Sequence, residues 1–275
     1  MIAAGNHSFC TRAVQSRSVA GARTMSDNIS SVPRPMARIT GVVYLLYFLT
    51  AVAGELLIRG IIVSGDPAAT ATNILAHERL FRLSAAVGLI ATALYIAVTV
   101  LFYRLLKPVN KTVSLLAAFF SLVGCAIQAF SSLFRVAPLV VLEGSPYLSV
   151  FKVDQLQAVA LMSIKLNVQA IYIYLVFFGL FNLLIGYLIF KSTFLPRILG
   201  VLMALSGLGW LTFLSPSLAN YLLTYIEVLG IIAEASLMLW LLVKGVNVER
   251  WKEQASAAVG MAIVARHAHL FQSLA

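Results

Sequence analysis

LSAAVGLIATALYIAVTVLFY, residues Leu83–Tyr103, runs without a charged side chain or a proline. An α-helix rises about 1.5 Å per residue, so about twenty residues cross a hydrocarbon core that is roughly 30 Å thick. A single segment in lipid satisfies its own backbone hydrogen bonds only when it is helical. This stretch therefore predicts a transmembrane helix.

Five further apolar runs accompany it in a chain with 61% hydrophobic and only 11% charged residues. The six predicted spans are Ile39–Ile58, Leu83–Tyr103, Val113–Phe134, Ala170–Phe190, Ile198–Leu214 and Tyr221–Val243. Because globular domains carry about 25% charged residues, this composition does not fit a soluble domain. We expect an all-α integral membrane bundle of six transmembrane helices over residues 37–245.

Polar segments flank the predicted bundle at residues 1–36 and 246–275. Because the first segment is polar, we expect it to be a disordered arm. It does not fit a secretory signal, which requires an apolar core of about 7–15 residues. Its early part also loosely resembles a mitochondrial transit peptide, and Met25 is an alternative start. The C-terminal tail contains Ala257–Leu270, a weakly amphipathic stretch of the kind that lies on anionic membrane surfaces.

The positive charges are distributed unevenly around the predicted spans. Of the 20 Lys and Arg residues, fourteen fall on the side of the N-terminus and six on the other side. Cytoplasmic loops carry an excess of Lys and Arg, so we expect both termini to be cytoplasmic. The net charge of +10 does not indicate a nucleic-acid partner, because no basic face alternates with aromatics on a soluble domain.

The longest predicted connection is Val136–Gln169, and it contains a turn signal at Glu143–Pro146. Apolar side chains then recur at helical spacing between Val153 and Ile164. We expect an amphipathic helix in this outer loop, leading into the fourth span.

Three carboxylates lie inside predicted spans: Glu55, Glu227 and Glu234. A charge at the bilayer centre costs about 2.5–3.5 kcal/mol on insertion scales, so such residues usually face a partner or water. Glu227 and Glu234 are seven residues apart, which places them within about 20° of each other around a helix. We therefore expect both to face the protein interior.

Other polar residues are predicted to join these acids in the outer half of the bundle. Arg59 follows Glu55 by four residues, the favourable order for a helical ion pair. The full set of candidate ligand or ion-pair residues is Glu55, Arg59, Gln128, Arg135, Asn167, Glu227 and Glu234. Two interpretations remain open: a cavity that binds a proton, a cation or a polar headgroup, or an ion-pair lock in which Arg135 neutralises Glu55 or Glu227.

Small and aromatic residues have simpler interpretations. Gly179 and Gly186 flank Asn182, and Gly200 and Gly207 follow in the next span, which predicts close helix packing. Tyrosines and a tryptophan near the span ends, including Tyr44, Tyr47 and Trp240, are expected in the interfacial aromatic belt.

Several chemistries lack their usual residues. All four histidines lie outside the predicted spans, and the sequence has no Cys-x-x-Cys pair and no Gly-Lys-Ser/Thr phosphate loop. We therefore predict no catalytic residue, no metal site and no cofactor.

Four stretches carry a resemblance to a known family: Ala37–Gly41, Tyr103–Asn110, Phe177–Gly200 and Leu239–Asn247. Together they resemble the bacterial multi-span family named domain of unknown function 4386, over roughly residues 36–247. The resemblance implies a six-helix protein of the inner (plasma) membrane. It implies no substrate and no catalytic residue.

Three functions follow as hypotheses. The leading one is the handling of a small ligand, proton or ion at the polar cluster. The alternative is a non-catalytic scaffold or partner-binding subunit in the lipid bilayer, including a homo-oligomer. An intramembrane enzyme acting on lipid ranks last, because histidines and metal ligands are missing from the spans.

Overall fold

The computed structural model of the chain describes residues 33–144 and 146–272, and every regular element in these ranges is helical. The helices are α2 (Pro33–Leu57), α3 (Pro67–Ala76), α4 (Glu78–Leu106), α5 (Lys111–Leu142), η1 (Pro146–Leu148), α6 (Val153–Lys191), α7 (Arg197–Leu211), η2 (Thr212–Leu214), α8 (Pro216–Val243) and α9 (Val248–Gln272). Six of them are long and apolar enough to cross a membrane. The predicted all-α bundle of six spans is confirmed.

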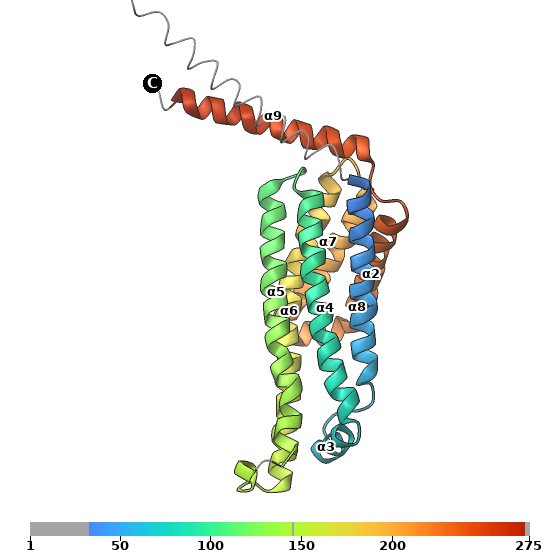
Figure 1. The fold of residues 1–275 in the computed structure, drawn as a ribbon, viewed down its shortest axis with the longest axis vertical. Helices are drawn as coiled ribbons and strands as arrows, with labels where there is room; N and C mark the ends of the chain where they lie inside the picture. The colour runs from blue at the N-terminus through green and yellow to red at the C-terminus, as the bar shows by residue number, and fades with distance from the viewer. Residues whose placement is uncertain (1–32, 145, 273–275) are drawn as a thin grey trace, which may run out of the picture.

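The six long helices run along one common axis, and α9 lies across one end of them (Figure 1). The short helix α3 and the turn between α5 and α6 lie at the opposite end. We call these the α9 end and the α3 end. Successive spans run in opposite directions, so α2, α5 and α7 begin at the α9 end.

The α3 end extends well beyond a bilayer core. Helix α6 has 39 residues, which at about 1.5 Å per residue is close to 58 Å, almost twice the hydrocarbon thickness. A separate apolar cluster holds this projecting part together, and its buried members are Ile61, Ile74, Phe81, Leu139 and Ile164. Helix α3 thus packs on the protruding parts of α4, α5 and α6.

The long connection differs from its prediction. Helix α5 continues through Pro138 to Leu142, and α6 begins at Val153 and runs without a break into the fourth span. The expected amphipathic helix forms, but as the first turns of α6. Leu139 and Ile164 are buried in the same cluster, and both helices continue beyond the membrane core. The connection between α5 and α6 is therefore shorter than predicted.

Both ends of the chain join the bundle more closely than expected. Helix α2 begins at Pro33, inside the expected arm, while the predictions for residues 1–32 and for Met25 lie outside the described residues. At the other end, residues of the predicted tail form α9. The Trp251 indole donates a hydrogen bond to the Leu105 carbonyl at 2.9 Å, and Ala255 is buried beside it. These contacts fix the first turns of α9 to the bundle.

Helices α6 and α7 pack backbone to backbone. A Cβ atom added at Gly186 would lie 2.5 Å from the Ala204 nitrogen, and one at Gly207 would lie 2.6 Å from the Leu183 nitrogen. Such distances leave no room for any side chain, so the predicted close packing of these spans is present in the structure.

Candidate functional site

One carboxylate is buried inside the bundle. Glu234, on α8, is 8% exposed, and its Oε2 accepts a hydrogen bond of 3.0 Å from the hydroxyl of Tyr44 on α2. Asn182, on α6, is completely buried and lies beside the same carboxylate. No Lys or Arg in the described ranges forms an ion pair with Glu234. An acid inside a membrane protein usually faces a polar partner, a water-filled cavity or an ion pathway.

An aromatic cluster from three helices adjoins this carboxylate through Tyr44. The rings of Tyr47 and Tyr95 are 4.6 Å apart, and that of Tyr95 lies 6.4 Å from Tyr44 and 5.6 Å from Phe178. These side chains come from α2, α4 and α6, so the site is built by the central helices of the bundle. Ring faces carry partial negative charge, which favours a cation nearby.

Several buried polar atoms around the bundle centre have no hydrogen-bond partner among the described residues. They are Tyr95 OH, Gln128 Oε1, Ser206 Oγ, Trp210 Nε1, and both side-chain atoms of Asn182. An unpartnered buried polar group costs about 1–3 kcal/mol, so this number of them calls for an explanation. Tyr95 and Asn182, together with Glu234 and Tyr44, form what we call the central polar group. The Tyr95 hydroxyl in this group has no hydrogen-bond partner among the described residues.

A second polar contact lies nearer the α3 end. The Arg135 guanidinium is 3.1 Å from a Glu55 carboxylate oxygen. The Arg135 side chain is only 12% exposed, whereas that of Glu55 is 69% exposed. Of the two predicted partners of Arg135, Glu55 and Glu227, it is Glu55 that forms the ion pair. We call this pair the rim ion pair.

The remaining candidates divide between these two regions. The Asn167 amide donates to the Ser131 carbonyl at 2.9 Å, one turn along α5 from Arg135. Gln128 lies on α5 between the rim ion pair and the bundle centre. Arg59 is exposed and forms no ion pair in the described part of the chain, because α2 ends at Leu57 and the helical spacing to Glu55 is lost.

Glu227 does not join either group. Its side chain is exposed on α8, and it forms no ion pair or hydrogen bond with any other described residue. Its neighbour Ile226 packs instead into a cluster with Phe213 and Ala219. Glu227 is turned by about 100° from Ile226 around the helix, away from that cluster. The expectation that Glu227 and Glu234 share one inward environment is therefore wrong.

The candidate residues from the sequence included only Glu234 of the central polar group, so Tyr44, Tyr95 and Asn182 were missed. Tyr44 was expected in the interfacial belt, but it is 1% exposed and bonded to Glu234. Asn182 was interpreted only as a neighbour of packing glycines. Its position in the middle of an otherwise apolar span was the available signal, because an amide in lipid needs a partner.

Comparison with known proteins places the chain by sequence alone. No curated protein and no solved structure matches it. The match to a protein family covers residues 39–245, which contain five of the six spans, most of the first, and both polar regions described above. The chain belongs to the family described as domain of unknown function (DUF4386).

Proposed function

We propose that this membrane protein binds and passes a proton or a small monovalent cation at the central polar group. The observation that carries the proposal is the buried Glu234 carboxylate, which has one hydroxyl donor and no basic partner among the described residues. Burying an ionised carboxylate in lipid without a cation is costly, so protonation or cation binding at this position is favoured.

The polar residues of α5 support a route from the α3 end to this site. Arg135 and Gln128 are seven residues apart on α5, a rise of about 10 Å, and Cys125 is about 4.5 Å further along. The unpartnered Gln128 Oε1 thus lies between the rim ion pair and the bundle centre. A proton or a partly hydrated cation needs polar stations of this kind to cross an apolar interior.

The test is a flux measurement on the full chain in liposomes. We expect wild-type protein to dissipate a gradient of H⁺, Na⁺ or K⁺, and Glu234→Gln to abolish this flux. Glu227→Gln is the matched control, because it removes the same charge from the same helix at an exposed position. Loss of flux in Glu234→Gln alone supports the proposal. Equal flux in both variants, or no wild-type flux of any of the three ions, overturns it.

The alternative function is a non-catalytic membrane scaffold, and the α6–α7 interface favours it. The backbone contact at Gly186 and Gly207 makes this pair of helices a stiff element. We expect a scaffold to keep its partners during purification in mild detergent. A chain that always elutes as a solitary monomer in size-exclusion chromatography with light scattering would count against this alternative.

We also propose that the protein lies in the inner (plasma) membrane with the α9 end in the cytoplasm. The support is the excess of Lys and Arg on the side that carries both termini. A reporter that is active only in the cytoplasm, fused after Ala275, should be active. An inactive reporter there, together with an active one inserted in the connection between α5 and α6, would reverse the orientation.

A further inference from the structure

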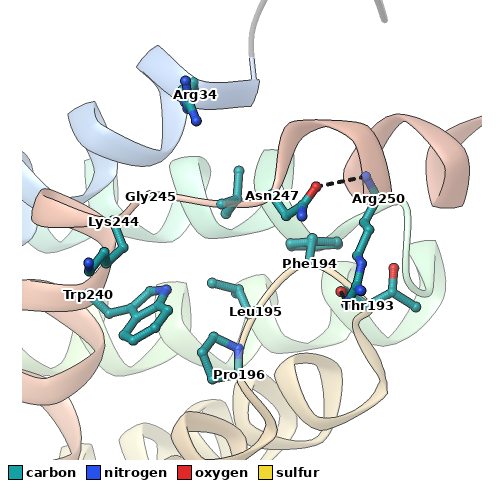
Figure 2. Close-up of a pocket in the computed structure, with 11 residues that line it drawn as sticks. Arg34, Thr193, Phe194, Leu195, Pro196, Trp240, Lys244, Gly245, Asn247 and Arg250 are labelled. Atoms are coloured by element: carbon teal, nitrogen blue, oxygen red, sulfur yellow. Dashed lines mark hydrogen bonds between the residues drawn. The ribbon is translucent and has the colours of Figure 1, made fainter.

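A pocket with a cavity volume of about 390 Å³ opens at the α9 end, away from the central polar group (Figure 2). It lies where the starts of α2, α7 and α9 meet the ends of α6 and α8. Its lining residues are Arg34, Thr193, Phe194, Leu195, Pro196, Trp240, Lys244, Gly245, Val246, Asn247 and Arg250. No residue of the proposed function contributes to it.

The charges on this pocket are all of one sign. Arg34, Lys244 and Arg250 come from three different segments, and no acid lines the pocket. None of the three forms an ion pair with another described residue. The Arg250 guanidinium has only a long hydrogen bond, 3.4 Å, to the Thr193 carbonyl. The pocket therefore carries positive charge that no ion pair with a described acidic residue compensates.

Two helix starts add to this charge. The residues that precede α7 and α9 are Pro196 and Asn247, and both line the pocket. Helix N-termini carry a partial positive charge and attract anions. The C-terminus of α8 contributes the opposite partial charge, and Lys244 lies directly at it and offsets it.

The rest of the lining combines the polar residues Thr193 and Asn247 with apolar ones. Phe194 and Leu195 are 4% and 5% exposed, and Figure 2 shows them between Trp240 on one side and Arg250 on the other. The pocket also lies at the level where the apolar run of α8 ends at Val243. An apolar base next to basic side chains at this level matches an amphiphilic anion whose charge sits at the membrane surface.

We propose that this pocket binds a phosphate-bearing anion, the chemistry shared by the headgroup of an anionic phospholipid and a free phosphate ester. Three cations from separate segments line the pocket, and a contact between any of them and a phosphate group would be charge-assisted. Binding would also join the start of α2, the end of α8 and the start of α9 through one ligand.

The experiment uses the full chain in two arms. In the first, native mass spectrometry counts the phosphatidylglycerol molecules retained after extraction from nanodiscs, with phosphatidylcholine nanodiscs for comparison. In the second, isothermal titration measures the binding of inorganic phosphate and glycerol 3-phosphate in neutral detergent. The variant is Lys244→Gln/Arg250→Gln, and the control is Lys107→Gln/Lys111→Gln. The control removes the same charge at the same end but outside the pocket.

We expect the pocket variant to bind the anion roughly tenfold more weakly or worse, since each basic residue near a membrane surface contributes about 1 kcal/mol. The control should bind as wild type does. An effect confined to the nanodisc arm identifies a lipid headgroup, and an effect in the titration arm identifies a soluble phosphate. If the pocket variant does not fold, Arg34→Gln replaces it, because the Arg34 side chain is exposed. Equal binding by pocket variant and control in both arms, or no binding by wild type, overturns the proposal.

Discussion

The α6–α7 interface and the central polar group hold neighbouring helices together in opposite ways. Between α6 and α7, glycines allow the backbones to touch, and a Cβ at Gly200 would lie 2.6 Å from the Phe190 nitrogen. Between α2 and α8, the Tyr44 hydroxyl reaches across to the Glu234 carboxylate. Unpartnered buried atoms occur on both sides of this comparison, at Ser206 on α7 and at Tyr95 in the central polar group, but only the second region retains a buried acid.

The two kinds of contact differ in how much they stabilise the bundle. Lipid gives helices no hydrophobic reason to associate, so close van der Waals packing is the efficient way to hold them. Polar contacts in the membrane add only about 0.6 kcal/mol each on average. Stability alone could be obtained from close helix packing at glycines, as between α6 and α7. The proposed function therefore rests on the central polar group, whose buried acid close packing alone does not require.

The largest effect on stability is expected from disrupting the α6–α7 interface. In Gly186→Ala, the new Cβ would lie 2.5 Å from the Ala204 nitrogen, so the two helices must separate. We expect the free energy of unfolding to fall by about 1–3 kcal/mol, the usual cost of overpacking. Denaturant titration in mixed micelles measures this change.

Gly209→Ala is the matched control, because Gly209 is also on α7 but its Cβ would lie 3.4 Å from the Ile226 side chain, an ordinary van der Waals distance. Alanine favours a helix over glycine by up to about 1 kcal/mol in water, so this variant should be neutral or slightly more stable. Equal stability of the two variants would show that the α6–α7 interface is not tightly packed in the membrane.

A smaller effect on stability is expected at the rim ion pair, because Arg135 is mostly buried and Glu55 is mostly exposed. Removing the carboxylate in Glu55→Gln leaves the mostly buried Arg135 without its partner, whereas Arg135→Gln leaves an exposed Glu55 that water can solvate. We expect Glu55→Gln to be the more destabilising variant. The double variant should give a coupling energy below about 1 kcal/mol, because one partner is solvent-exposed. A coupling of several kcal/mol would instead make this pair a principal lock of the bundle.

The spans, their number and the close packing of α6 and α7 could be predicted from the sequence because each is a local property. Length and apolar composition identify a span such as Leu83–Tyr103, which lies inside α4 as observed. Glycines at helical spacing, such as Gly179 and Gly186, identify a packing face whatever the partner is. No knowledge of the neighbouring helix was needed.

The site could be predicted only in part, because partners depend on how the helices are rotated and how far they extend. Helical spacing placed Glu227 and Glu234 on one face, but packing at Ile226 leaves Glu227 exposed. The contact between Tyr44 and Glu234 joins residues 190 positions apart, and no local pattern encodes it. The basic pocket likewise combines the ends of helices that are distant in sequence.

The smallest effect, and the sharpest test of the central polar group, comes from two tyrosines that differ only in the partner of the hydroxyl. Tyr44 and Tyr95 are 1% and 2% exposed, but the Tyr44 hydroxyl bonds to Glu234 and the Tyr95 hydroxyl has no partner in the described structure. Tyr44→Phe should lower the free energy of unfolding by about 0.6 kcal/mol. Tyr95→Phe should leave it unchanged or raise it, because an unpaired buried hydroxyl is removed.

If that hydroxyl serves a bound proton or cation, Tyr95→Phe will still reduce the liposome flux despite its full stability. A variant with unchanged stability and unchanged flux would show that Tyr95 serves only to fill space, and would confine the proposed site to Glu234, Tyr44 and Asn182.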